Sequence, residues 1–252
     1  MKASLSRRSV LLRATYVTAG AVVGSQLFLS PGYAAGRPDL DKIRKALRRA
    51  QEHARERRER VLSGIRSKNG WEMEKVVDDR GNIYTRPVPG TPVEVQIRMG
   101  DVETVLVHVI RRFHYEVDIL LQGEVVGWRP PRTVRRKFAE SNQASGTAVQ
   151  IRPGHYPAGV RGGFFPQQQV VIRDILAELD GVVRWGGDDR SSDESLFYVD
   201  TKPGSSRLVQ VAEKIQEINE APGKGAGTAV DVFATARRRR AEKLARVQRV
   251  RG

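Results

Sequence analysis

The chain contains no cysteine. This absence excludes disulfide bonds and thiolate metal sites, although it leaves open the compartment in which the protein works. The chain also lacks a long, strongly hydrophobic run. The weakly apolar stretch at residues 14–29 is rich in Ala, Gly and Thr and is too short to span a bilayer comfortably. This composition therefore disfavours a permanent membrane helix.

Acidic residues are scarce: 29 Asp and Glu stand against 44 Lys and Arg, which leaves a formal net charge of +15 at pH 7. The surplus lies in the flanks, because residues 70–232 are close to neutral. Flanking basicity of this kind is weak evidence for a nucleic-acid surface, so nucleic acid is not the expected partner. A chain of 252 residues, 39% of them hydrophobic, accommodates one mid-sized domain with tails.

The N-terminus predicts export. Residues 6–12 read SRRSVLL, a twin-arginine pattern, and the apolar stretch that follows ends in small residues at Gly32, Tyr33 and Ala34. We therefore expect residues 1–34 to be a twin-arginine signal peptide. The protein would then be extracellular or associated with the cell wall, and would meet the membrane only transiently through that signal.

Residues 35–69 combine helix-forming residues with dense charge, and Leu40, Ile43 and Leu47 recur at helical spacing. This pattern predicts a narrow amphipathic helix capped by Asp39 or Asp41. Two interpretations remain open: a solvated basic spacer, or a helix that binds a polyanion such as a wall polymer.

Residues 70–220 have the composition of a folded domain. Alternating apolar residues predict an antiparallel sheet, and apolar stripes at helical spacing predict three core helices. The fold class expected is α+β, with a small antiparallel sheet packed by helices. The predicted strands span residues 71–77, 82–86, 93–98, 123–128, 182–185 and 196–199, and the predicted helices begin near Asp101, Pro166 and Ser205.

Residues 221–252 predict a flexible linker and a basic tail that is either helical or disordered. The segment begins with PGKGAG, which lacks the Lys-Ser/Thr ending of a phosphate loop. The tail contains the run Arg237 to Arg240. Wall polymer, anionic lipid and nucleic acid all match its charge, and the sequence does not choose among them.

One central stretch carries a family resemblance. Residues 141–150 read SNQASGTAVQ, residues 184–189 read RWGGDD, and residues 193–197 read DESLF. This layout resembles the zinc D-alanyl-D-alanine carboxypeptidases of bacterial cell walls, the family of the vancomycin-resistance D,D-carboxypeptidases. The family reads Ser-Asn-His-x-Ser-Gly-x-Ala-x-Asp in the first segment, and its His and Asp bind zinc. A later acidic-x-x-His segment supplies the third ligand and a catalytic carboxylate.

The resemblance spans roughly residues 70–215 and implies a D,D-carboxypeptidase-like fold, yet all three ligand positions have changed. They hold Gln143, Gln150 and Leu196. A glutamine amide oxygen is a poor zinc donor and leucine offers none, so we expect neither a metal nor another cofactor.

The catalytic residues implied by the resemblance are Asp193 as general base, with Glu194 beside it, and Arg129 to steady the developing negative oxygen. Without a metal to acidify water, a carboxylate alone supplies only part of the required barrier reduction. The alternative for Asp193 and Glu194 is that they cap loops or pair with an arginine such as Arg190. For Arg129 the alternative is an ordinary surface position.

Three further residues are candidates for the lining of the cleft: Ser145, His155 and Trp185. His155 is the histidine nearest to the former ligand set, five residues after Gln150 on a predicted loop. His108 and His114 lie six residues apart, a spacing that does not place two ligands on one helix face.

Three functions remain. The favoured hypothesis is an exported, zinc-free pseudoenzyme of the family that binds wall peptide or a partner protein. The second is an active peptidoglycan D,D-peptidase with a non-standard site. The third is a polyanion-binding wall protein that acts through its basic flanks.

Overall fold

A computed structural model of the protein describes residues 39–251. The predicted signal peptide, residues 1–34, lies outside this range. The chain divides into two compact units, residues 1–50 and residues 51–252. Helix α1 (Leu40–Arg60) has no buried residue, and Asp39 caps it by accepting hydrogen bonds from the N–H groups of Asp41 and Lys42, both at 3.1 Å. The predicted amphipathic helix and its cap are thus confirmed.

Two antiparallel hairpins follow α1. Strand β1 (Leu62–Arg66) pairs with β2 (Glu72–Glu74), and β3 (Ile83–Pro87) pairs with β4 (Glu94–Arg98). Because β1 is hydrogen-bonded to β2, the folded domain begins before residue 70, the boundary predicted from composition. The charged character of residues 35–69 concealed this first strand.

A four-stranded antiparallel sheet forms the centre of the domain, in the order β5-β6-β8-β7. Its strands are β5 (Val125–Val126), β6 (Ala148–Ile151), β8 (Leu196–Val199) and β7 (Val183–Trp185). Alternate residues of β6 and β8 point to opposite faces, as strand geometry requires. One face enters the main hydrophobic core through Val149, Ile151, Phe197 and Val199. The other face forms a small separate cluster of Ala139, Ala148, Leu196 and Tyr198.

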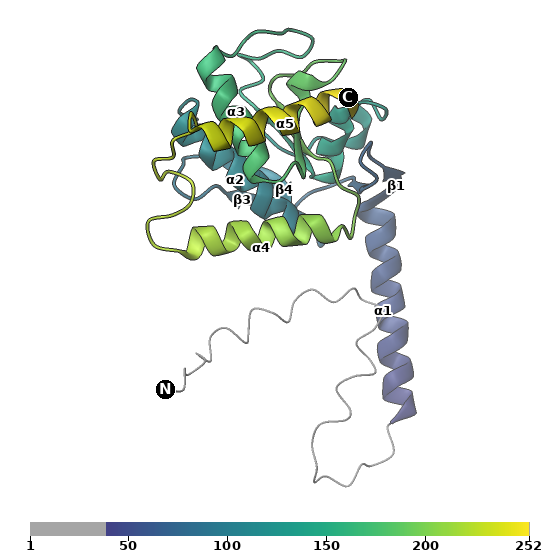
Figure 1. Cartoon of the computed structure of the whole chain (residues 1–252). Helices are drawn as coiled ribbons and strands as arrows, with labels where there is room; N and C mark the ends of the chain where they lie inside the picture. The colour runs from purple at the N-terminus through teal and green to yellow at the C-terminus, as the bar shows by residue number, and fades with distance from the viewer. Residues whose placement is uncertain (1–38, 252) are drawn as a thin grey trace, which may run out of the picture. The chain divides into compact units, whose positions relative to one another are not determined.

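Helices cover the core side of this sheet (Figure 1). Helix α2 (Asp101–Glu116) contacts both α3 (Pro166–Glu178) and α4 (Ser206–Glu220). The apolar stripe predicted for α2 is buried throughout, whereas Gly100 rather than Asp101 is its N-cap residue. The described residues therefore form an α+β fold with small antiparallel sheets, which confirms the coarse fold class.

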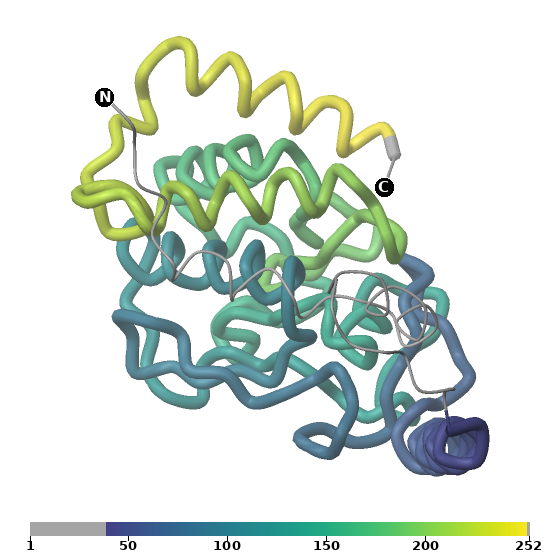
Figure 2. The backbone as a smooth tube through the Cα atoms, turned by 90° about the horizontal axis from the view of Figure 1, so that it is seen from below, coloured from purple at the N-terminus to yellow at the C-terminus, as the bar shows by residue number. Residues whose placement is uncertain are grey.

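A predicted flexible region proves to be part of the fold. Helix α5 (Thr235–Arg251) packs along α3, as both views show (Figures 1 and 2). Arg237 donates to Asp174 at 2.8 and 2.6 Å, and Gln248 Nε2 donates to the carbonyl of Val183 at 3.0 Å. The predicted loose tail at residues 221–252 is corrected on this point. Its partner, a buried carboxylate on α3, is 63 residues away in the chain.

A buried ionic cluster joins α2, α3 and α5. The Arg112 side chain is 2% exposed and donates to Asp174 at 3.0 Å and to Glu178 at 2.9 Å. His108 Nε2 lies 2.9 Å from Glu178 Oε2. Burial alone would raise the pKa of Glu178, but the hydrogen bond with His108 and the charge of Arg112 lower that pKa to about 2.

Within residues 39–251, no helix is both long and apolar enough to cross a membrane.

Candidate functional site

The three positions that the resemblance matches to metal ligands lie close together in space. Gln143 lies on the 3-10 helix η2 (Ala139–Ser145), and its Nε2 is 3.3 Å from Oε1 of Gln150 on β6. Gln150 is the register partner of Leu196 on β8, so their side chains share one face of the sheet. Residues separated by more than fifty positions are thereby brought to one place.

Asp193 joins this group. Gln150 Nε2 donates to Asp193 Oδ2 at 2.8 Å, and Asp193 Oδ1 accepts from the backbone N–H of Ser195 at 3.1 Å and from its hydroxyl at 2.6 Å. Asp193 is 7% exposed, and its hydrogen-bond donors are all neutral. The structure therefore places a carboxylate beside the former ligand positions, held by an amide and by a serine.

A cavity of about 220 Å³ opens over Asp193 and Leu196. Phe138 and Ala139 add apolar wall, and two further carboxylates, Glu140 and Asp189, also line it. The cavity lining includes four basic side chains: Lys68, Arg135, Lys137 and Arg190.

Two of the three carboxylates in the cavity lining accept hydrogen bonds from an arginine or a tyrosine. Glu140 accepts from Arg135 at 2.9 and 3.0 Å, and this hydrogen bonding lowers the pKa of Glu140. Asp189 accepts from the Tyr198 hydroxyl at 3.0 and 2.9 Å. Burial is the main cause that raises the pKa of Tyr198. Asp193 differs from both, because the donors that hold it, Gln150 and Ser195, are neutral groups.

Ser141, Asn142 and Thr147 of the motif form hydrogen bonds that hold a neighbouring turn in place. Ser141 Oγ accepts from the N–H of Lys68 at 2.9 Å, and Asn142 Oδ1 accepts from the N–H of Asn69 at 3.1 Å. Asn69 Nδ2 in turn donates to Thr147 Oγ1 at 2.8 Å. The motif thus holds the turn that follows β1 against η2 and β6, which brings Lys68 to the cavity.

Ser145 and Gly146 complete the frame, by which we mean residues 67–69 and 141–147 with the hydrogen bonds that join them. Ser145 is fully buried, and its hydroxyl lies 3.0 Å from that of Ser67 and 2.9 Å from that of Thr147. The prediction that Ser145 lines the cleft is wrong, because its hydroxyl is used within the frame. Gly146 has φ of 67°, and a Cβ there would approach the backbone nitrogen of Arg98 to 2.8 Å, so only glycine fits.

Glu194 and Trp185 belong to the scaffold and not to the cavity. Glu194 accepts from the N–H groups of Gly162 and Gly163, both at 2.8 Å, and its carbonyl accepts from Trp185 Nε1 at 2.7 Å. Trp185 lies on the core face of the sheet, with the guanidinium of Arg173 4.8 Å from its ring. The loop-capping alternative for Glu194 holds, whereas the cleft position predicted for Trp185 is corrected.

Two other candidates lie away from the cavity. His155 is exposed, and its Nε2 is 3.0 Å from Nη2 of Arg152. Arg129 Nη2 donates to the carbonyl of Thr133 at 3.4 Å, and Arg129 does not line the cavity. Both positions follow from loops whose course the sequence did not reveal.

The donor set does not fit zinc. The Gln143 amide nitrogen is directed at the carbonyls of Val126 and Gly127, at 3.2 and 3.0 Å, and at Gln150. Leu196 supplies no donor atom. Within the described part of the chain, no three His, Cys, Asp or Glu side chains come together in a metal-binding arrangement. We therefore assign no chemical step to a metal here.

Sequence reasoning missed most of the basic residues of the cavity. Lys68 falls within the predicted spacer, and Arg135 and Lys137 fall in a segment for which no element is predicted. Arg190 was considered only as an ion-pair partner, and it forms no ion pair with any residue in 39–251. No local pattern identifies these residues, because they meet only when three separate segments of the chain converge.

Comparison of the chain with protein-family models, with curated proteins and with solved structures finds no match. The resemblance to the carboxypeptidases therefore rests on the motif residues of the sequence alone.

Proposed function

We propose that the protein is an exported, non-catalytic relative of the zinc D-alanyl-D-alanine carboxypeptidases, and that its cavity binds the end of a cell-wall peptide. The observation that carries this proposal is the convergence of Gln143, Gln150 and Leu196 with Asp193. Four positions that match the family's motif lie together, and two of them, Asp193 and Leu196, line the cavity. The residue types needed for metal binding are absent from three of the four.

The chemistry at these positions favours binding over cleavage. Hydrolysis of a peptide by this family's route needs a metal-bound water, and the ligand positions present amides and an alkyl group. A positioned general base such as Asp193 contributes about 10²- to 10⁴-fold, far less than amide hydrolysis requires. Asp193 is also engaged by Gln150 and Ser195, which hold it in place as a hydrogen-bond acceptor.

The charges around the cavity favour an anionic peptide end. Lys68, Lys137 and Arg190 form no ion pair with another described residue, so their charges are available to a carboxylate. Asp193 offers an acceptor for a peptide N–H or an ammonium group. Phe138, which is 39% exposed, offers apolar surface to a small side chain such as that of alanine.

The test is a calorimetric titration of the purified full chain with a peptide that ends in D-alanyl-D-alanine, run beside an assay for released D-alanine. We expect binding without release. Arg190→Ala should weaken binding by about fivefold or more, because it removes a charge that faces the carboxylate. Arg132→Ala is the matched control, since Arg132 is exposed in a neighbouring loop and does not line the cavity.

Two results would replace the proposal. Release of D-alanine by the unmodified chain would identify an active D,D-peptidase with a non-standard site. Absence of peptide binding, together with binding of an anionic wall polymer, would favour a polyanion-binding protein that acts through its basic flanks. A protein partner seated in the cavity would compete with the peptide.

Export is a separate part of the proposal and rests on the twin-arginine pattern at residues 6–12. Replacing Arg7 and Arg8 by lysine should leave the precursor in the cytoplasm. Cell fractionation with antibody detection measures this, and unchanged secretion of the double variant would remove the twin-arginine assignment.

A further inference from the structure

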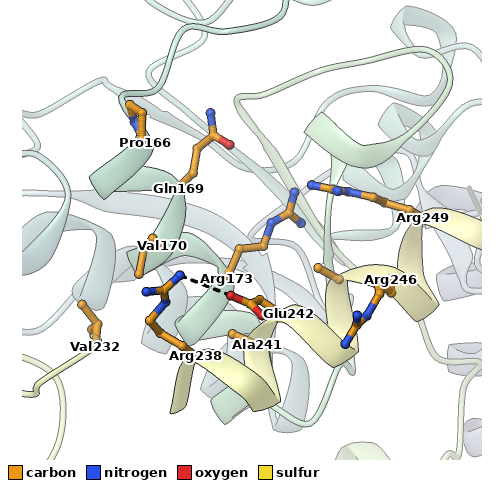
Figure 3. Close-up of a pocket in the computed structure, with 11 residues that line it drawn as sticks. Pro166, Gln169, Val170, Arg173, Val232, Arg238, Ala241, Glu242, Arg246 and Arg249 are labelled. Carbon is orange, nitrogen blue, oxygen red and sulfur yellow. Dashed lines mark hydrogen bonds and ion pairs between the residues drawn. The ribbon is translucent and has the colours of Figure 1, made fainter. Parts of the chain in front are cut away.

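A second cavity lies between α3 and α5, on a part of the domain that the proposed function does not use (Figure 3). Its volume is about 410 Å³. The lining residues recur at intervals of three or four along each helix: Pro166, Gln169, Val170 and Arg173 on α3, and Arg238, Ala241, Glu242, Ala245, Arg246 and Arg249 on α5. The α5 set spans about 16 Å at 1.5 Å per residue, so the cavity is a groove that follows the two helices.

The groove combines an apolar floor with basic walls. Val170, Val232, Ala241 and Ala245 supply the floor. The arginines Arg173, Arg238, Arg246 and Arg249 surround it, as Figure 3 shows. An adjoining cavity of about 200 Å³ shares Gln169, Arg173 and Arg249 with the groove and adds Arg161.

Ion pairs within the groove use only part of this positive charge. Arg173 and Arg249 both bind Asp188, whose side chain is 5% exposed. Arg238 pairs with Glu242 at 3.4 Å. The side chain of Arg246 is exposed and forms no hydrogen bond or ion pair with another residue in the described range, and the side chain of Arg249 is 59% exposed. The groove therefore presents guanidinium groups that remain accessible to a ligand.

We propose that this groove binds a small amphiphilic phosphate ester, with its phosphate at Arg246 and Arg249 and its apolar portion on the floor. Guanidinium groups bind phosphate oxygens through paired, charge-assisted hydrogen bonds, and several of them match a dianion better than a single carboxylate. The apolar floor selects against a wholly hydrophilic polyanion, because covering Ala241 and Ala245 with a polar chain buries no apolar ligand surface. The volume is within the range of small-molecule sites.

The experiment is a calorimetric titration of the full chain with three probes: hexyl phosphate, inorganic phosphate and heptanoate. Hexyl phosphate should bind about tenfold tighter than either of the others, because only it uses both the arginines and the floor. Arg246→Gln should weaken hexyl phosphate binding by about tenfold. This variant should fold normally, because Arg246 has no partner in the described structure, and its melting temperature checks this.

Arg239→Gln provides the matched control. Arg239 is exposed on the same helix, lines neither cavity, and carries the same charge. Equal losses in the two variants would show a diffuse effect of charge and would overturn the proposal. If inorganic phosphate binds as tightly as hexyl phosphate, the apolar floor does not contribute to binding. If heptanoate binds as tightly as hexyl phosphate, the result would indicate an acidic peptide as the ligand. Either result also overturns the proposal.

A further experiment distinguishes a lipid headgroup from a soluble ester as the source of the phosphate. Sedimentation with vesicles that contain phosphatidic acid, a phosphate monoester, that is lost in Arg246→Gln would identify a lipid headgroup. Tight binding of hexyl phosphate without such sedimentation would identify a soluble ester.

Discussion

Gln150 lies directly opposite Leu196 in the antiparallel pair of β6 and β8, so that an amide and an alkyl side chain share one face of the sheet beside Asp193. In the carboxypeptidases that the sequence resembles, the matching positions hold a carboxylate and an imidazole that bind the same zinc ion. Strand pairing alone thus places the side chains at positions 150 and 196 next to each other.

The first prediction is that zinc binding returns when the ligands are restored. The triple variant Gln143→His, Gln150→Asp and Leu196→His should bind about one zinc per chain, because η2 and the paired strands already hold these positions together. Elemental analysis and calorimetry measure this. A chelator should lower the melting temperature of the triple variant and leave that of the unmodified chain unchanged.

The control is the double variant that keeps Leu196, which should bind zinc far more weakly because it lacks the third ligand. A triple variant that folds and takes up no zinc would show that the three side chains do not converge on one point. We expect little cleavage of D-alanyl-D-alanine by the triple variant, even with zinc bound. Cleavage also needs a group that stabilises the developing negative oxygen, and Arg129 lies outside the cavity.

The second prediction concerns the turn held by the motif. Asn69→Ala should lower the free energy of unfolding by about 1 to 3 kcal/mol, because it removes hydrogen bonds to Thr147 Oγ1 at 2.8 Å and to the carbonyl of Val199 at 2.9 Å. Urea denaturation measures the loss. Gln122→Ala, at an exposed position, should change stability by less than about 0.5 kcal/mol. If the two variants lose similar amounts of free energy of unfolding, the hydrogen bonds of Asn69 do not stabilise the fold.

The third prediction is a pH dependence of stability that originates at Glu178. Its pKa in the folded protein is about 2, below the ordinary value of 4.5. A carboxylate whose pKa is lower in the folded than in the unfolded protein stabilises the fold at pH values above its pKa in the unfolded protein. This stabilisation is lost as the pH falls through its pKa in the folded protein. The free energy of unfolding should therefore fall between about pH 4.5 and pH 2, by on the order of 3 kcal/mol from this group.

Urea denaturation at a series of pH values tests this origin. Glu178→Gln should be less stable near neutral pH and should lose less stability on acidification than the unmodified chain. Glu220→Gln, an exposed change on α4, should keep the full acid dependence. If Glu178→Gln also keeps it, the acid sensitivity comes from other carboxylates.

The fourth prediction is that two neighbouring arginines of α5 differ in their contribution to stability. Arg237→Ala should destabilise the fold by about 1 to 3 kcal/mol, because Asp174, which is 3% exposed, loses two charge-assisted hydrogen bonds. Arg239→Ala should cost less than about 0.5 kcal/mol, since Arg239 is exposed. Thermal or urea denaturation of the pair measures the difference. Equal, small effects would mean that α5 is not held against α3.

The sequence by itself determined the elements whose signal is local. The apolar stripe of α2 follows from the 3.6-residue helical period, and the strands around Val183 and Phe197 follow from short apolar runs bounded by glycine and acidic loops. The pattern at residues 141–150 and 193–197 also singled out Gln143, Gln150 and Asp193, whose side chains are in contact. The helix and the strands could be predicted because each depends on neighbours within a few positions.

Only the tertiary structure decided which surroundings each side chain has. Ser145, His155 and Trp185 are close to the motif in sequence, yet one lies inside the frame, one lies on the surface and one enters the opposite face of the sheet. Alternation along a strand sends adjacent residues to opposite faces, and loops turn in directions that their composition does not specify.

The position of α5 was decided in the same way. Its arginines indicate only a basic segment when read locally, because dense positive charge is equally compatible with a solvated tail. Asp174 becomes a partner for Arg237, 63 positions away in the chain, only after α3 and α5 have packed side by side. The groove between these helices exists for the same reason. Its floor and its arginines belong to segments that contact each other only in the folded chain.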